Sequence, residues 1–266
     1  MIIIGERING MFKAVKQAIQ ERDAAVIQDL ARRQLAEGAD MLDINVGTAA
    51  AEPVEAMRWL VETVRAVTDA PLAIDNPNYA AMKAGLEACS GAKMINSTIG
   101  SDEALDKHFA LAKEHDAMVV ALCIDDNGVP VNADGRCEIA MRVLAKAMEH
   151  DIPNEHLFID PIIIPVKADQ RTPGMVLEAI QMFRTLADPA PHIVIGLSNL
   201  SQGAVDRKII NRTFLTMCIG AGLDAAIVDP LDTELMDAMI TAELLMDHAI
   251  YSDSFLKAYR QKYQPA

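Results

Sequence analysis

The stretch HIVIGLSN, residues 192–199, contains a pattern that recurs along this chain. A short run rich in Ile and Val is followed at once by Gly196, Ser198 and Asn199. The run lacks the polar alternation of a half-exposed strand, and is typical of a parallel strand that helices cover on the outside. The polar residues behind it then lie at the carboxyl end of a buried strand.

Eight apolar runs of this kind alternate with amphipathic segments from one end of the chain to the other. After the second run, Met57, Leu60, Val61 and Val64 repeat with the period of a helix. Eight strands, each followed by a helix, predict an α/β fold of the (β/α)₈ TIM barrel type, with an open doubly wound sheet as the alternative. The runs span residues 1–4, 41–46, 71–74, 93–95, 118–124, 157–159, 192–195 and 225–228.

No low-complexity tract or Pro/Gly/Ser linker divides the 266 residues, so a single domain over residues 1–266 is predicted. In a barrel the carboxyl ends of all strands meet at one mouth, where barrel enzymes place their chemistry. Asp and Asn dominate the positions at these ends, which predicts a ligand-binding mouth. The positions are Glu6, Arg7, Asn9, Asp43, Asn45, Asp75, Asn76, Asn78, Asn96, Ser97, Asp125, Asp126, Asp160, Ser198, Asn199 and Asp229.

The composition limits the partners and the compartment. The formal net charge of −14 repels phosphate backbones and argues against nucleic acid as a partner. The four cysteines form no C-x-x-C pair, which favours reduced thiols in a reducing compartment. The N-terminal apolar run is too short for a signal peptide, and no run is long enough to span a membrane. We therefore expect a cytoplasmic protein.

A mouth rich in Asp and Asn suits a ring whose edge presents adjacent hydrogen-bond donors and acceptors. An amide offers both a donor and an acceptor, and a carboxylate accepts two parallel hydrogen bonds. The 2-amino-4-oxo pyrimidine edge of a pterin has this pattern. A divalent metal is the competing use of such acids, but a metal site usually has tighter clustering or His in support. The sequence therefore favours a pterin, with no metal bound directly.

Six motifs occur in order over essentially the whole chain: IGERIN (residues 4–9), LDIN (42–45), ID (74–75), INS (95–97), FIDP (158–161) and GLSN (196–199). Together they resemble the pterin-binding methyltransferases, in particular the methyltetrahydrofolate:corrinoid protein methyltransferases of anaerobic bacteria. They are also similar to the folate domain of cobalamin-dependent methionine synthase. The resemblance implies a homodimer of barrels that bind tetrahydrofolate or 5-methyltetrahydrofolate. It further implies methyl exchange between N5 of the folate and the cobalt of a corrinoid (cobalamin) carried by a separate partner protein.

The resemblance also implies roles for individual residues. Asp75, Asn96 and Asp160 match the family positions that hold the pterin edge, and Asn199 matches the catalytic amide that reaches N5. Gly196 and Ser198 are counted with the pterin-binding residues, and further candidates are Glu6, Asp43, Gln202 and Arg207.

The expected chemistry gives Asn199 one electrostatic task. An amine nitrogen is a poor leaving group unless it becomes positively charged, so the protein must favour charge at N5. The Asn199 amide can rotate to accept a hydrogen bond from protonated N5–H, and in the reverse direction the same contact eases the loss of the proton. The alternative is that Asn199 only caps the segment that follows it.

The loop after the third strand departs from the family's pattern. Residues 75–78 (DNPN) stand where the acetogenic enzymes are expected to have Asp-Ser-Thr-Asn. The change favours the demethylation direction, from a methylcorrinoid protein to tetrahydrofolate, as in anaerobic O-demethylase systems. The alternative is an enzyme of the acetyl-CoA pathway, which transfers methyl from methyltetrahydrofolate to a corrinoid iron–sulfur protein.

Two other functions and one false signal complete the alternatives. Dihydropteroate synthase would have Arg-x-His near the last strand, which here ends in VDP (residues 228–230). A non-catalytic folate-binding or corrinoid-docking module has no need of an amide aimed at N5. Residues 106–108 (DKH) look like the start of a cobalt-binding D-x-H-x-x-G loop, but Leu111 replaces the Gly. We therefore interpret His108 as a surface histidine on a helix.

Overall fold

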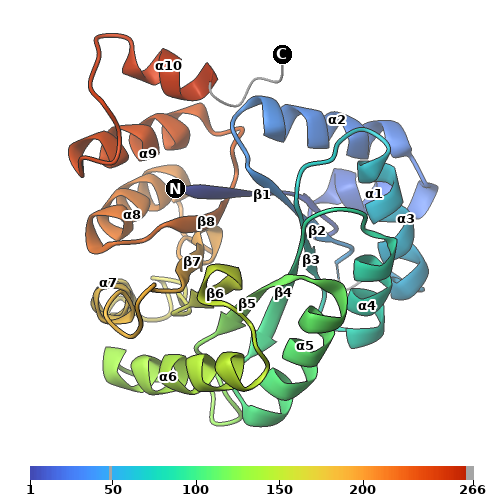
Figure 1. Cartoon of the computed structure of the whole chain (residues 1–266). Helices are drawn as coiled ribbons and strands as arrows, with labels where there is room; N and C mark the ends of the chain where they lie inside the picture. The colour runs from blue at the N-terminus through green and yellow to red at the C-terminus, as the bar shows by residue number, and fades with distance from the viewer. Residues whose placement is uncertain (48–49, 262–266) are drawn as a thin grey trace.

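The computed structural model describes residues 1–47 and 50–261, and these form a closed barrel of parallel strands (Figure 1). Each strand pairs with its neighbours in chain order, and β1 pairs with β8 to close the ring. The predicted (β/α)₈ barrel is confirmed, and all eight predicted strands are present. They are β1 (Ile2–Asn9), β2 (Met41–Asn45), β3 (Leu72–Asp75), β4 (Lys93–Ile99), β5 (Met118–Leu122), β6 (Leu157–Asp160), β7 (His192–Gly196) and β8 (Ala225–Val228).

Helices surround the barrel and connect consecutive strands (Figure 1). The helix predicted around Met57 and Val64 is α3, and these residues are buried. Two helices follow β1, and short 3-10 turns precede β6 and follow β7. The helical elements are α1 (Lys13–Glu21), α2 (Ala24–Ala36), α3 (Pro53–Arg65), α4 (Tyr79–Ala88), α5 (Asp102–His115), α6 (Ala133–Glu149), η1 (Asn154–His156), α7 (Thr172–Phe183), η2 (Leu197–Asn199), α8 (Arg207–Ala221), α9 (Thr233–Leu245) and α10 (Phe255–Gln261).

Strands β1 and β4 extend beyond the predicted apolar runs. β1 continues through its polar residues to Asn9, with an irregularity in its pairing to β2 between Gly5 and Ile8. Gln34 of α2 supports this irregularity, because its fully buried side chain accepts the backbone N–H of Arg7 at 2.9 Å. Polar residues that the sequence pattern places after the strands therefore lie within them, where backbone pairing fixes their direction.

The inside of the barrel is filled by one buried apolar side chain from each strand. A fully buried Val, Leu, Ile, Phe or Met side chain stabilises a fold by about 1.5–3 kcal/mol. This inner layer fills the barrel, so its interior is a packed core rather than a channel. Its members are Ile4, Met41, Ala73, Met94, Val120, Phe158, Val194 and Ala225.

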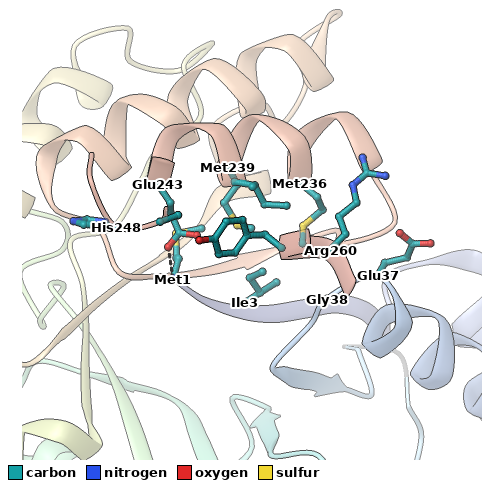
Figure 2. Close-up of a pocket in the computed structure, with 12 residues that line it drawn as sticks. Met1, Ile3, Glu37, Gly38, Met236, Met239, Glu243, His248 and Arg260 are labelled. Atoms are coloured by element: carbon teal, nitrogen blue, oxygen red, sulfur yellow. Dashed lines mark hydrogen bonds and ion pairs between the residues drawn. The ribbon is translucent and has the colours of Figure 1, made fainter. Parts of the chain in front are cut away.

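At the amino ends of the strands, a pocket lies between the start of β1 and the C-terminal helices. Met1 and Ile3 face Met236 and Met239 of α9, and Arg260 of α10 also lines the pocket (Figure 2). The amino group of Met1 forms an ion pair with Glu243. This pocket is at the opposite end of the barrel from the polar ends of the strands. Residues at that end usually serve stability rather than chemistry.

The predicted thiol state agrees with the structure, since Cys89, Cys123, Cys137 and Cys218 are all free and buried. Over residues 1–47 and 50–261, no helix combines the length and the apolar composition needed to cross a bilayer.

Candidate active site

A layer of polar side chains lies directly above the apolar inner layer. Side chains two residues apart in a strand point to the same side. Each member of the inner layer is therefore followed, two positions later, by a residue that points into the carboxyl-terminal mouth. These mouth residues are Glu6, Asp43, Asp75, Asn96, Leu122, Asp160, Gly196 and Ile227. The structure thus brings together five of the predicted polar site residues. We call these five residues, Glu6, Asp43, Asp75, Asn96 and Asp160, the mouth layer.

Asp43 and Asn96 form a buried pair in the mouth layer. Asn96 Nδ2 donates to Asp43 Oδ1 at 2.9 Å, and both side chains are less than one tenth exposed. Because the amide nitrogen faces Asp43, the amide oxygen of Asn96 is turned the other way and can accept a hydrogen bond from a ligand.

A second amide, that of Asn45, contacts the carboxylate of Asp75. Its Oδ1 accepts the backbone N–H of Gly47 at 2.6 Å, which fixes the orientation of the amide. Its Nδ2 then donates to Asp75 Oδ2, also at 2.6 Å. Asn45 pairs with Asp75 in the register of β2 and β3, so the contact is set by the sheet. The sequence pattern places Asn45 at the mouth but assigns it no role, and the contact with Asp75 supplies one.

Asp160 lies across the barrel at the end of β6 and is 7% exposed. Its Oδ1 accepts the backbone N–H of Ile162 at 2.7 Å, and the N–H of Gly196 is a second backbone partner. These bonds hold the carboxylate against the turn that follows β6.

The acids of the mouth layer have unusual proton affinities. Burial raises the pKa of Asp160 to about 7 and that of Asp75 to about 6. Burial, and then the nearby charge of Asp75, raise the pKa of Asp43 well above its usual value. Burial also raises the pKa of Glu6. Burial at the mouth therefore disfavours negative charge, and a ligand that offers N–H donors to these acids favours their ionised forms.

The 3-10 turn η2 brings Ser198 and Asn199 to the same mouth. Ser198 Oγ donates to Glu6 Oε1 at 2.7 Å, which links the end of β7 to β1. Arg207, at the start of α8, donates to the backbone oxygen of Ser198 and to Ser201 Oγ, each at 3.1 Å. The predicted residue Arg207 therefore holds the turn that carries Asn199.

Asn199 is exposed, and its amide folds back over Gly196. A Cβ placed on Gly196 would lie 3.0 Å from Nδ2 of Asn199, closer than nine in ten real Cβ contacts. Glycine at position 196 thus allows the amide to take up this position. The contact gives Gly196 a direct effect on the direction in which Asn199 points.

A pocket opens beside the mouth layer, between the ends of β1, β7 and β8. Arg7 borders it, forms an ion pair with Asp229 at 3.3 Å and lies over the ring of Phe12. Gln202 lies in the exposed turn after η2 and is not among the lining residues, so the structure does not bring this predicted residue to the site. Other lining residues are Glu6, Ser198, Asn199, Arg207 and Lys208.

The unusual DNPN loop has a structural role. Asn76 Oδ1 accepts the backbone N–H of Asn78 at 2.8 Å, which forms a tight turn. Asn78 Oδ1 then accepts the N–H groups of Ala80 and Ala81 and caps the first turn of α4. The loop leaves Asp75 at the end of β3 and starts α4 directly after it.

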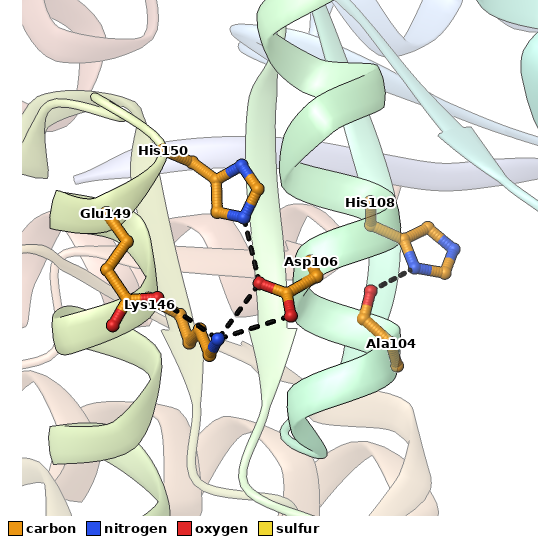
Figure 3. A network of polar contacts seen from close by, with 6 residues as sticks. All are labelled: Ala104, Asp106, His108, Lys146, Glu149 and His150. Carbon is orange, nitrogen blue, oxygen red and sulfur yellow. Dashed lines mark hydrogen bonds and ion pairs between the residues drawn. The ribbon is translucent and has the colours of Figure 1, made fainter.

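His108 is on α5, as predicted, but it is partly buried rather than a free surface histidine. Its Nδ1 faces the backbone oxygen of Ala104 at 2.8 Å (Figure 3). Burial lowers the pKa of His108. The neighbouring Asp106 instead bonds to Lys146 of α6 and to His150, the C-cap of that helix, so Asp106 and His108 of the DKH motif face different partners (Figure 3).

Comparison with known proteins identifies the family to which the chain is similar. A family profile described as pterin binding enzyme matches residues 9–229. The chain is 31% identical over 263 residues to a methylcorrinoid:tetrahydrofolate methyltransferase of Eubacterium limosum, which is 98% of this chain and 97% of that protein. It is 32% identical over 242 residues to methionine synthase of Mycobacterium tuberculosis, covering 86% of this chain and 20% of that protein.

Among solved structures, the Yersinia pestis dihydropteroate synthase with a sulfonamide drug matches with a TM-score of 0.67. The match covers 93% of this chain and 94% of that one at 14% identity, so it supports the fold alone. The family profile and the Eubacterium limosum relative are stronger evidence, and they confirm the resemblance that the motifs predict. The chain therefore belongs to the pterin-binding enzyme family, among its methyltransferases.

Proposed function

We propose that this enzyme transfers a methyl group from the cobalt of a methylated corrinoid protein to N5 of tetrahydrofolate. The mouth layer and the neighbouring Asn45 carry the proposal, because they combine oriented amides with buried acids that lack cationic partners strong enough to keep their pKa values low. Such a set matches the donor-rich edge of a reduced pterin. The Eubacterium limosum relative, whose name gives this pair of substrates, aligns with the chain over nearly its full length.

In this proposal Asp75, Asn96 and Asp160 hold the pterin edge. The two acids accept hydrogen bonds from ring N–H and amino groups, and the Asn96 oxygen accepts a further one. Asp43 and Asn45 orient Asn96 and Asp75 from behind. The folate would then lie across the mouth from β3 and β4 to β6, with N5 toward η2.

Asn199 would act at N5. In the proposed direction, the N5 lone pair forms a bond to the methyl carbon, and the carbon–cobalt bond breaks with its electron pair left on cobalt as Co(I). N5 becomes positively charged and then loses its proton to solvent. The amide oxygen of Asn199 accepts a hydrogen bond from N5–H while the charge is present. No other acid or base of the protein is required for the bond change itself.

The direction rests on the name of the relative rather than on the DNPN loop. That loop is a turn and a helix cap, so it is explained without reference to the partner. A transfer from methyltetrahydrofolate to a corrinoid iron–sulfur protein is the second candidate, since the mouth would hold either folate in the same way. A homodimer, a cytoplasmic location and the absence of a directly bound metal belong to the same proposal.

A transfer assay tests the proposed function. Purified protein, anaerobic, is mixed with tetrahydrofolate and free methylcob(III)alamin, and the appearance of cob(I)alamin is followed by its absorption. We expect methyltetrahydrofolate to form in equal amount, with the same rate after treatment with EDTA. Folate binding without transfer in either direction would support the non-catalytic module instead. Loss of activity in EDTA, restored by a divalent ion, would contradict the metal-free proposal.

Gly196→Ala should slow transfer more than it weakens folate binding. The added methyl group would lie against the Asn199 amide and displace it, while the pterin acids on β3 and β6 are untouched. We expect the single-turnover rate to fall by about tenfold, the effect of a misdirected rather than absent hydrogen bond. Gly220→Ala in α8 is the matched control, because a Cβ there meets no atom. An unchanged rate in Gly196→Ala would show that the close contact has no bearing on catalysis.

A further inference from the structure

Arg136, in the first turn of α6, is the largest fully buried side chain of the described residues. It is 1% exposed, and it points inward from α6 to the loops that follow β5 and β6. A buried guanidinium group is costly unless it is hydrogen-bonded and its charge is balanced. Its surroundings therefore indicate what the charge is for.

The hydrogen bonds of Arg136 go to backbone oxygens. Nε donates to the oxygen of Pro161 at 2.7 Å, directly after the pterin acid Asp160. Nη1 donates to the oxygens of Pro130 at 2.6 Å and of Asn132 at 3.0 Å. One side chain thus joins the loop after β6 to the loop after β5.

The turn that Arg136 holds is strained. Ile162 has a φ of 62°, in the left-handed region that a β-branched residue rarely adopts. Its N–H donates to Asp160 Oδ1 at 2.7 Å, so the strained residue and the pterin acid fix each other. A conformation of this kind persists only where the surroundings over-determine it, and functional sites are where such conformations cluster. The bond from Arg136 to Pro161, between the two residues, supplies that constraint.

The charge of Arg136 also acts on the Asp160 carboxylate. No carboxylate forms an ion pair with its guanidinium in residues 1–47 and 50–261, and Asp160 is the carboxylate whose charge acts on it. Burial raises the pKa of Asp160, and the backbone N–H groups of Ile162 and Gly196 and the charge of Arg136 oppose the rise. The other acids of the mouth layer are on β1 to β3, on the other side of the mouth.

We propose that Arg136 is a positioning residue for the pterin edge: it locks the turn after β6 so that the Asp160 carboxylate faces the ring, and its buried charge favours the ionised form of that carboxylate. The inference rests on the proposed function, because it takes Asp160 as a folate ligand. Arg136 itself does not touch the substrate.

Two variants separate the charge from the geometry, and tetrahydrofolate binding is titrated for each between pH 5.5 and 8.5. Arg136→Met removes both, so we expect the Kd at pH 7 to rise about tenfold and the midpoint of its pH dependence to move to higher pH. Arg136→Lys keeps the charge, but its single ammonium group cannot make the hydrogen bonds to both loops that the guanidinium makes. Its midpoint should stay near that of the wild type, while its Kd rises by a smaller factor.

Arg65→Met is the matched control. Arg65 donates to the backbone oxygen of Ala70 at 2.6 Å, the same kind of contact, but at the amino end of the strands. Its loss should lower the melting temperature and leave the Kd and the midpoint unchanged. A merely structural Arg136 would behave in the same way, which would overturn the proposal. If Arg136→Met does not fold, Arg136→Lys decides: a wild-type Kd in a folded variant also overturns it.

Asp160→Asn, measured in parallel, separates this inference from the proposed function. If that variant binds tetrahydrofolate as tightly as the wild type, Asp160 is not a ligand and the proposed site is wrong. If it binds weakly while both Arg136 variants bind normally, the site stands and only the role of Arg136 fails.

Discussion

Asn199→Ala should lower the rate constant of methyl transfer by about 100-fold or more, the usual effect of removing one preorganised contact to a developing charge. The amide is exposed at the mouth, directed by Gly196 and carried by a turn that Arg207 holds. It is therefore placed by the backbone before substrate arrives. Folate affinity should fall much less, because Asp75, Asn96 and Asp160 hold the ring at the other end.

Single-turnover transfer at saturating folate, with a binding titration of the same variant, distinguishes the two roles. A contact that strengthens only in the transition state changes the rate at saturation, whereas uniform binding changes the affinity alone. Asn154→Ala removes an amide near the amino end of β6 and serves as control. If Asn199→Ala loses affinity but transfers at the wild-type rate once saturated, Asn199 only binds the folate.

The strands were predictable because most of them contain an unbroken run of apolar residues. A strand that is covered on both faces is apolar along nearly its whole length, so HIVIG and AAIV can be identified as strands from the sequence alone. The convergence of Glu6, Asp43, Asp75, Asn96 and Asp160 follows from the barrel once the strand count is known. Their exact register does not, because it depends on where β1 is irregular and how far β4 continues into polar sequence.

The supporting contacts were beyond the reach of the sequence. Arg136 looks like any other arginine on an amphipathic helix, and only the folded chain places its guanidinium between two loops. The partner of Asn45 likewise lies 30 residues away, on the next strand. Gln202 illustrates the converse, since its place three residues after Asn199 in sequence does not bring it into the lining of the pocket. Sequence patterns identify which residues reach the mouth, but not which ones orient them.

Asp160→Asn should stabilise the empty protein at pH 8 and at the same time weaken its binding of tetrahydrofolate. Burial raises the pKa of Asp160 from 3.8 to about 7. Between these two values the folded state binds more protons than the unfolded state, so the free energy of unfolding falls as the pH rises. The stability associated with protonated Asp160 is fully present below pH 3.8 and is lost as the pH rises through about 7. An uncharged amide of the same shape escapes this loss.

The magnitude and the measurement follow from the same linkage. A difference of this size in pKa corresponds to a few kcal/mol, on the order of 1.4 kcal/mol for each pH unit over which the proton is held. Urea unfolding at pH 5.5 and pH 8 should therefore show a steeper fall for the wild type than for Asp160→Asn, with the variant more stable at pH 8. Tetrahydrofolate binding should weaken by roughly tenfold or more, because the ring donors lose a charge-assisted acceptor. The opposite changes in stability and in folate affinity are informative, because replacing a residue that serves the fold would lower the free energy of unfolding. A variant that is less stable than the wild type at pH 8, or that binds folate as tightly, would show that the buried carboxylate is not held for its ligand.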